Sequence, residues 1–248
     1  VNYVSAMNYG LERLKEFPLC LRLIREIHEK LLNNGRGSNR NPGEFRKTQN
    51  WIGPAGCTLA EARFVPPIIP DMEKALENLE NFFYAEDSIP ALIKIALIHS
   101  QFESIHPFYD GNGRTGRIIN VLYIVQNRLL DLPILYLSRY ITRNKAEYYR
   151  LIQAIRDKNS DNASEWEEGI LFMLRAVEET AFDTINLVKG IGKLMTDYKN
   201  ILRPLFGKYY KHELLNNLFF HPYTKLEYFQ RDMSISRQTA SKYLDKYD

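Results

Sequence analysis

Residues 106–117 read His-Pro-Phe-Tyr-Asp-Gly-Asn-Gly-Arg-Thr-Gly-Arg, and this stretch joins two helical patterns. Pro107 disfavours helical geometry in the residue before it, so the apolar helix that begins near Ser88 must end at Ile105 or His106. A second helix begins near residues 112–114, and its first amide groups have no partner inside the helix. The stretch is therefore a helix–loop–helix connection whose outward-pointing amides suit an anion.

The glycines of this stretch also match a different motif. Gly111-x-Gly113-x-x-Gly116 has the spacing of the dinucleotide-binding fingerprint, with Asp131 at a suitable distance downstream. That fingerprint needs a strand before it and a βαβ unit around it, whereas helical patterns lie on both sides here. The context therefore argues against a dinucleotide-binding fold, and the sequence contains no Walker-type Gly-Lys-Ser/Thr.

The side chains of the stretch suit a magnesium-bound polyphosphate beside a proton acceptor. Arg114 and Arg117 are three residues apart and share one face of the first helical turn, where they can pair with phosphates. The amide of Asn112 can donate to a phosphate oxygen, and Asp110 can hold Mg²⁺. His106 has a near-neutral pKa, which suits acceptance of a hydroxyl proton. A capped turn with surface arginines would explain the glycines, but not this combination.

The composition is that of an ordinary globular protein and excludes few functions. The chain has 248 residues, 45% hydrophobic and 25% charged, with a net charge of +3 that does not by itself imply nucleic acid. Cys20 and Cys57 have neither disulfide nor zinc spacing, which predicts a reducing, cytoplasmic location. The sequence shows no signal peptide and no apolar run of transmembrane length, so we expect no membrane partner.

The periodicity predicts a mostly helical protein. Two short extended candidates, residues 49–52 and 63–65, are separated by Gly53-Pro-Ala-Gly56 and predict a β-hairpin or flap. Helices are predicted after it at about 71–84, 88–106, 112–130, 133–140, 144–157, 162–188 and 192–201. Beyond Pro204 three short helices are predicted at about 208–217, 224–231 and 236–247, and the last two have helix-turn-helix spacing.

The stretch 106–117 resembles the core motif of the Fic (Fido) family, His-Pro-Phe-x-[Asp/Glu]-Gly-Asn-Gly-Arg-x-x-Arg, at every position. Other segments resemble bacterial Fic proteins with an N-terminal Fic extension and a C-terminal winged helix. They are Asn-Tyr-Gly-Leu-Glu-Arg-Leu at 8–14, Arg-Gly-Ser-Asn at 36–39, Pro-Gly-Glu-Phe-Arg at 42–46, Gln-Asn-Trp-Ile-Gly at 49–53 and Phe-Val-Pro-Pro at 64–67. The resemblance implies an all-α fold: a Fic core with an N-terminal extension and a β-hairpin flap over 1–203, and a partial winged-helix module over 204–248.

The activity implied by the resemblance is transfer of AMP from ATP to a Tyr, Thr or Ser hydroxyl of a protein, with release of pyrophosphate. His106 would be the base and Asp110 the ligand of Mg²⁺. Family members often dimerise and modify themselves, so a homodimer and self-modification are further expectations. Alternatives are the use of another nucleotide at the same site, or the removal of AMP.

The same resemblance assigns the nucleotide contacts. Gly111 to Gly113 would cradle the anion, with Asn112 on the α-phosphate and the two arginines on the β- and γ-phosphates. The residues implied to contact ATP are Gly111, Asn112, Gly113, Arg114, Thr115, Gly116 and Arg117. A kinase-like subgroup carries lysine in the second glycine's place, so Gly113 favours nucleotidyl transfer.

Two further sites are implied outside the stretch. Tyr148 and Tyr149 match the positions where family members line the adenine site, although core aromatics on an amphipathic helix explain them equally well. Arg63, Phe64 and Val65 would align an extended target segment by backbone pairing, unless the hairpin is only a lid. We expect His99 in the core, Glu103 in support of the His106 loop, and His28 without a role.

Many Fic proteins carry an inhibitory helix with a Ser/Thr-x-x-x-Glu-Gly/Asn motif, whose glutamate pairs with the second arginine. No such motif precedes the 106–117 stretch in this sequence, so we expect a de-repressed fragment that is more active than a form extended at its N-terminus. At the other end of the chain, side chains near Ser236–Lys242 suit contacts to DNA, but no wing strands follow. A nucleotide-tuned DNA-binding regulator is therefore a rival function, and a protein-docking or structural module is a rival for this segment.

Overall fold

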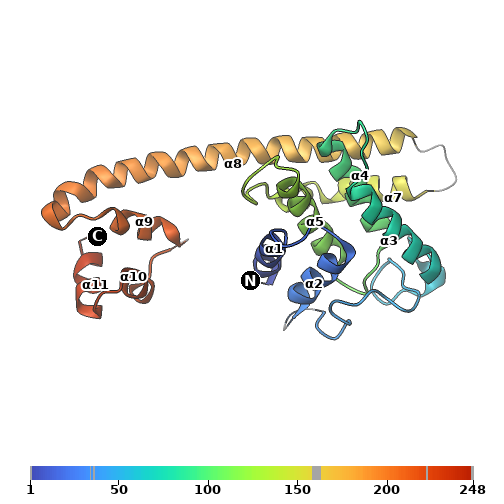
Figure 1. Cartoon of the computed structure of the whole chain (residues 1–248), viewed down its shortest axis with the longest axis horizontal. Coiled ribbons are helices and arrows are strands. Elements are labelled where there is room, and N and C mark those ends of the chain that lie inside the picture. The colour runs from blue at the N-terminus through green and yellow to red at the C-terminus, as the bar shows by residue number, and fades with distance from the viewer. Residues whose placement is uncertain (1, 34, 36, 158–162, 222, 247–248) are drawn as a thin grey trace. The chain divides into compact units, whose positions relative to one another are not determined.

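The computed structural model describes residues 2–33, 35, 37–157, 163–221 and 223–246, and it is all-α as predicted (Figure 1). The helices are α1 (Asn2–Arg13), α2 (Leu21–Leu32), α3 (Ile69–Phe83), α4 (Ala91–Ile105), α5 (Asn112–Gln126), α6 (Leu137–Arg143), α7 (Lys145–Arg156), α8 (Ala163–Phe206), α9 (His212–Phe220), α10 (Leu226–Met233) and α11 (Arg237–Leu244). Two short 3₁₀ turns, η1 (Leu59–Glu61) and η2 (Gly207–Tyr209), complete the described elements.

The chain forms two compact units, Val1–Ala181 and Phe182–Asp248. Two helices were expected at about 162–188 and 192–201, but α8 continues unbroken through both ranges. Pro204 lies in the last turn of α8, and the helix ends two residues after it, at Phe206. The domain division predicted at residues 203 and 204 thus falls near the end of this helix.

The core of the first unit is built around α4 and α5. Both helices carry apolar residues on most of their surface, as expected for central helices. α4 and α5 pack against each other, α1 and α2 contact α5, and α3 and α7 contact α4. The buried apolar residues of α4 and α5 are Ile95, Ala96, Ile98, Phe102, Ile105, Ile118, Ile119, Val121, Leu122, Tyr123 and Ile124. This packing places the end of α4 and the start of α5, and so the 106–117 stretch, on a rigid base.

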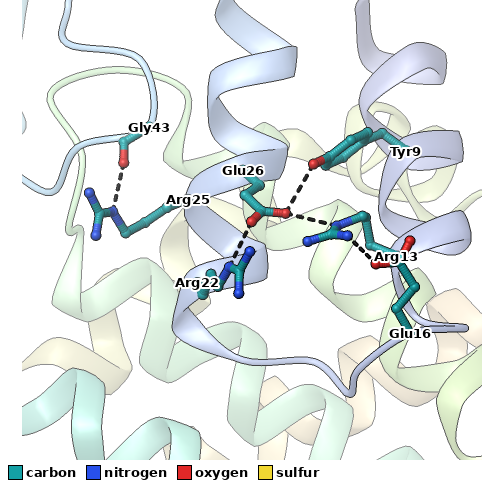
Figure 2. A network of polar contacts seen from close by, with 7 residues as sticks. All are labelled: Tyr9, Arg13, Glu16, Arg22, Arg25, Glu26 and Gly43. Carbon is teal, nitrogen blue, oxygen red and sulfur yellow. Dashed lines mark hydrogen bonds and ion pairs between the residues drawn. The ribbon is translucent and has the colours of Figure 1, made fainter.

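A polar network ties α1 to α2 (Figure 2). The Glu26 carboxylate accepts hydrogen bonds from Tyr9 Oη at 3.0 Å, Arg13 Nε at 3.1 Å and Arg22 Nε at 2.9 Å. Burial alone would raise the pKa of Glu26, but these three donors together lower it. The network fixes α2, whose opposite face buries His28.

The predicted β-hairpin is wrong. All of residues 49–66 are described and they contain no strand, only an isolated antiparallel bridge between Ile52 and Phe64. Ile52 N donates to Phe64 O at 2.9 Å, and Phe64 N donates to Ile52 O at 3.1 Å. The η1 turn on one side and Pro66-Pro67 on the other prevent a longer ladder, because proline has no amide to donate. We call residues 49–66 the flap segment.

The second unit packs α9, α10 and α11 against the end of α8. Its buried core residues are Leu202, Phe206, Leu214, Leu215, Phe229 and Ala240. α10 and α11 flank a turn at Ser234, which adopts a left-handed conformation, so the predicted helix-turn-helix spacing is present. Within the described residues 182–221 and 223–246 no wing strand is found.

None of the helices in the described ranges combines the length and apolar character needed to cross a membrane.

Candidate active site

His106 ends α4 in an unusual backbone conformation. Its φ is 48° and its ψ is 59°, and its amide donates to Phe102 O at 3.0 Å. A left-handed conformation at a residue other than glycine costs about 1–3 kcal/mol and persists only where the surroundings hold it. Pro107 contributes to it, because the proline ring disfavours helical geometry at His106. The chain therefore turns sharply at the candidate base.

The environment of the His106 ring keeps it uncharged. Burial, reinforced by the positive charge of Arg156, lowers its pKa from 6.5 to about 4. The Nδ1 atom is buried, and a hydrogen bond of the ring to the Glu103 backbone opposes the lowering of the pKa. At neutral pH the ring is thus a neutral imidazole with a nitrogen available to a ligand or a proton.

The loop between His106 and α5 is closed by Asn112. Its Oδ1 accepts from Phe108 N at 2.9 Å, and its Nδ2 donates to Phe108 O at 2.8 Å. Gly111 precedes α5 with a φ of 84°, a conformation that glycine adopts without strain. Since Nδ2 carries two hydrogens, one of them is left for the phosphate contact expected of Asn112.

His28 was expected to have no role, and that expectation is wrong. Its Nδ1 accepts from Gly43 N at 2.9 Å, so Nε2 carries the hydrogen and donates to Asp110 O at 2.9 Å. The ring stacks on Phe108 with 3.7 Å between centroids and 6° between planes. Burial lowers the pKa of His28, which keeps the ring in this neutral form. Nothing in the sequence around His28 indicated these partners.

The Asp110 carboxylate lies where the loop enters α5. Oδ1 accepts from Gly111 N at 2.6 Å and is 3.5 Å from Arg114 Nη2. Oδ2 is 2.8 Å from the place that a Cβ on Gly37 would occupy, so residue 37 must lack a side chain. Asp110 is about one-third exposed, which leaves this carboxylate open to solvent.

The described residues could hold Mg²⁺ only if a substrate supplied some of the ion's ligands. Nowhere in the described ranges do three or more His, Cys, Asp or Glu side chains gather as a metal site. Mg²⁺ is commonly held by one or two carboxylates together with substrate phosphates and water. A single open carboxylate at Asp110, next to the N-terminus of α5, fits that donor set.

Glycines 113 and 116 allow charged groups to lie against α5. A Cβ on Gly113 would be 3.2 Å from Arg117 Nη1 and 3.4 Å from Glu103 Oε1. A Cβ on Gly116 would be 3.2 Å from the same Glu103 oxygen. Burial raises the pKa of Glu103, while the charges of Arg156 and Arg117 oppose that rise. Thr115 is fully buried, so it turns inward rather than toward a ligand.

Several buried polar atoms near His106 lack a protein partner. They include Glu103 Oε1, Arg117 Nε and Arg156 Nε, judged within the described residues. Buried polar atoms are rarely left without a partner, so such a group indicates a place where a ligand or water binds. Arg156 was missed in the sequence, where nothing but its place at the end of a helix distinguished it.

A cleft of about 700 Å³ lies between the flap segment and α7. Its lining includes Arg63, Phe64 and Val65 from the flap segment and Gln153 and Arg156 from α7. The Arg156 guanidinium covers the Phe64 ring at 4.1 Å, and its Nη2 donates to Glu103 O at 2.6 Å. Arg156 thus connects the cleft to the region around His106. Gln153 Nε2 donates to Arg63 O at 3.2 Å, which occupies one carbonyl of the flap segment.

The two candidate adenine residues lie in different environments. Tyr148 is buried, and its hydroxyl is 2.9 Å from His99 Nε2, while His99 Nδ1 is 3.0 Å from Asn120 Nδ2. Tyr149 is 58% exposed and meets the Tyr148 ring edge-on. Along α7 the cleft is lined only from Arg150 onward, so neither tyrosine lines it. Of the two, only Tyr149 has an exposed surface to offer a ligand.

Comparison with known proteins places these features in a family. Residues 18–124 match the Fic/DOC family model, and residues 194–247 match the C-terminal domain of SoFic-like protein adenylyltransferases. This chain contains a Fic domain. His106 and Asp110, with the α5 start, form its central motif, and the second unit corresponds to the SoFic-like C-terminal domain.

Relatives of the Fic domain carry names that state an activity. A probable protein adenylyltransferase of Aquifex aeolicus is 36% identical over 131 residues, covering 52% of this chain and 37% of that protein. The protein adenylyltransferase Fic of Drosophila grimshawi is 32% identical over 117 residues, covering 46% of this chain and 22% of that protein. The chain thus spans well under half the length of either relative.

Solved Fic structures share the fold at low sequence identity. A Fic family protein from Desulfovibrio desulfuricans G20 aligns with a TM-score of 0.60 and 20% identity, covering 98% of this chain and 66% of that one. A Fic domain containing signaling protein from Bacteroides thetaiotaomicron aligns with a TM-score of 0.57 and 18% identity, covering 76% and 72%. At such identities these structures show the fold alone.

Proposed function

We propose that this Fic domain transfers AMP from ATP to a Tyr, Thr or Ser hydroxyl of a protein target and releases pyrophosphate. The observation that carries the proposal is the neutral His106 ring at the loop that opens α5. A phosphate-binding helix start next to a proton acceptor is what nucleotidyl transfer to a hydroxyl requires. The names of the relatives support the same reaction.

The phosphates bind at the N-terminus of α5 in this proposal. The amides of Asn112 and Gly113 have no helical partner and carry partial positive charge toward the ligand, whereas the Gly111 amide already donates to Asp110 Oδ1. Arg114 and Arg117 pair with the β- and γ-phosphates from one face of the first turn, and Thr115 and Gly116 contribute backbone to the same turn. Asn112 offers its remaining Nδ2 hydrogen to the α-phosphate.

The reaction is an in-line displacement at the α-phosphorus. The target hydroxyl oxygen forms the new bond to phosphorus as the bond to pyrophosphate breaks. His106 accepts the hydroxyl proton at a ring nitrogen and later releases it to solvent. Asp110 would hold Mg²⁺, and the ion would supply positive charge that stabilises the leaving pyrophosphate.

The cleft between the flap segment and α7 is the proposed place of the substrates. Its lining by Arg63, Phe64 and Val65 supports these residues as the docking edge for an extended target segment, although one of their carbonyls is already bonded. Exposed Tyr149 remains the better candidate for an adenine contact than Tyr148. A cytoplasmic location, self-modification and a homodimer are further parts of this proposal.

Transfer from labelled ATP tests the proposal. The full chain and its His106→Ala variant would be incubated with Mg²⁺, a lysate and ATP labelled at either the α- or the γ-phosphate, with intact-mass analysis. His212→Ala is a matched control, because His212 lies in α9 of the second unit. Protein label from α-labelled ATP alone, lost only in His106→Ala, is the expected result. Label from the γ-phosphate would contradict AMP transfer, and label from other nucleotides in preference to ATP would change the co-substrate.

DNA is a second proposed partner, through the helix-turn-helix of the second unit. Arg237 and Lys242 on α11 suit phosphate contacts. Ser236 and Thr239 are less available, because Ser236 Oγ caps α11 by accepting from Thr239 N at 3.2 Å. Affinity for duplex DNA that falls steeply with salt, and falls further in Arg237→Ala, would support this partner. Affinity that is indifferent to salt or to Arg237 would favour a protein-docking or structural role.

A further inference from the structure

Arg46 is a fully buried arginine whose side chain bonds only to backbone carbonyls. It is 1% exposed. Its Nε donates to His106 O at 3.1 Å, its Nη1 to Thr48 O at 3.4 Å, and its Nη2 to Pro67 O. Its own amide donates to Pro107 O at 2.8 Å. No ion pair to Arg46 occurs within the described ranges.

A buried arginine without a carboxylate is costly, since burial disfavours its charge and lowers its pKa. Such a group is retained where its fixed array of donors joins acceptors that nothing else can join. Its three acceptors belong to separate parts of the chain: the residue before the flap segment, the residue after it, and the candidate base.

We propose that Arg46 is a positioning residue, which sets the place of His106 relative to the flap segment. Thr48 and Pro67 border the flap segment, so the guanidinium brings its two ends together. The same group binds the carbonyl of His106, whose backbone is in the left-handed conformation. The base and the segment that lines the cleft are thereby fixed to one rigid group.

Other contacts hold the flap segment. Gln49 Nε2 donates to Pro66 O at 2.8 Å and joins its two ends, and Asn50 Nδ2 donates to Phe108 O at 3.2 Å and joins it to the loop after His106. The Tyr109 hydroxyl accepts from Thr48 N at 3.1 Å. These side chains are partly exposed, and only Arg46 reaches His106 itself. The alignment of base and flap segment therefore depends most on Arg46.

A lysine at position 46 could not make the same three hydrogen bonds. Its ammonium is a compact point donor, whereas guanidinium donors point in several fixed directions in one plane. We expect Arg46→Lys to keep the buried charge and one carbonyl contact while losing the others. Arg46→Met removes the charge as well and keeps most of the volume.

The inference rests on the proposed AMP transfer, and the first test uses that reaction. kcat is expected to fall about 100-fold in Arg46→Met, the cost of a misplacement of about 1 Å, and less in Arg46→Lys. The KM for ATP should change little, because Arg46 contacts no phosphate-binding residue other than through the loop backbone. Arg25→Lys is the matched control: Arg25 Nε donates to Gly43 O at 2.8 Å, but Arg25 lies at the surface (Figure 2).

Three results would overturn the inference: full kcat in Arg46→Lys and Arg46→Met, an equal loss in Arg25→Lys, or a rise in the KM for ATP with kcat unchanged. If Arg46→Met does not fold, Arg46→Lys carries the test.

A second measurement does not depend on activity. The His106 ring would be titrated by NMR in the wild-type chain and in Arg46→Lys. Release of the His106 backbone should move the ring's pKa upward, toward its ordinary value. An unchanged titration would overturn the inference even if no AMP transfer occurs in any variant, whereas absence of transfer in the wild type alone counts against the proposed function.

Discussion

At His106, burial and the positive charge of Arg156 both lower the pKa of the ring. Both disfavour the imidazolium, so the pKa is about 4 in the absence of ligand. A base with so low a pKa accepts a proton weakly. Phosphates that offset the charge of Arg156 would strengthen it, and the site would then become basic only when the nucleotide is present.

We therefore expect the pKa of His106 to rise when a nucleotide binds. The measurement is an NMR titration of the histidines with and without Mg²⁺ and an ATP analogue that cannot be cleaved at the α-phosphorus. His212, in the second unit, serves as the internal control. A His106 pKa that stays near 4, or falls, would show that the phosphates do not bind near this ring.

At His28, one neutral ring holds two backbone groups of different segments. In His28→Phe the stack on Phe108 can remain, but Gly43 N and Asp110 O lose their partners. Leaving buried groups unpaired costs about 1–3 kcal/mol, so the first unit should unfold at a lower urea concentration. Because Asp110 is displaced as well, AMP transfer should need more Mg²⁺. Unchanged stability together with unchanged Mg²⁺ dependence would show that His28 does not hold the loop in place.

At the scale of elements, the contact of α4 with the first turn of α5 depends on glycine. Gly116→Ala would place a methyl group 3.2 Å from both Glu103 Oε1 and Phe102 Cδ1. Crowding of a packed interface costs about 1–3 kcal/mol, which exceeds the gain of up to about 1 kcal/mol from alanine's helix propensity.

Gly192→Ala is the matched control, because a Cβ at that helical position meets nothing within 4 Å. We expect Gly116→Ala to lower, and Gly192→Ala to raise, the urea midpoint of the unit that contains each residue. A stabilising Gly116→Ala would mean that α4 and α5 are further apart than described.

At the scale of the whole molecule, the two units should respond to acid at different pH. His99 and His106, in the first unit, have pKa values of about 3 and about 4 in the folded state against 6.5 in the unfolded chain. The unfolded chain binds more protons in that interval, so stability is lost as the pH falls from about 6.5 toward 4. In the second unit, the hydrogen bonds from Arg231 and His221 lower the pKa of Asp232 below 3.8, and its contribution is lost only below that pH.

Thermal unfolding recorded at pH 7, 5.5 and 4.5 checks this difference. The transition of the first unit should move to lower temperature over this range, and His99→Gln should reduce the movement. The transition of the second unit should move less. A larger fall in the unfolding temperature of the second unit than of the first would contradict the assignment of the acid-sensitive groups.

Much of this architecture follows from local sequence signals. Pro107 and the glycines after it end α4 and begin α5 where they were predicted, and the helix-turn-helix spacing near Ser234 is also local. The flap segment shows the limit of such signals, because two extended candidates are compatible with a hairpin until Pro66 and the η1 turn restrict their pairing to one bridge. Likewise α8 runs through residues 189–191, where a break between two helices was expected.

The sequence by itself determined most of the helices, the motif and the family resemblance, since periodicity, proline, glycine and residue spacing act over a few neighbours. Only the tertiary structure decided which distant groups complete the site. Arg46 reaches a carbonyl 60 residues away, His28 one 82 residues away, and Arg156 one 53 residues away. Their partners are backbone carbonyls, which every residue carries, so side-chain identity could not predict them. Burial of His106 in this environment then lowers its pKa, and no local sequence pattern encodes that burial.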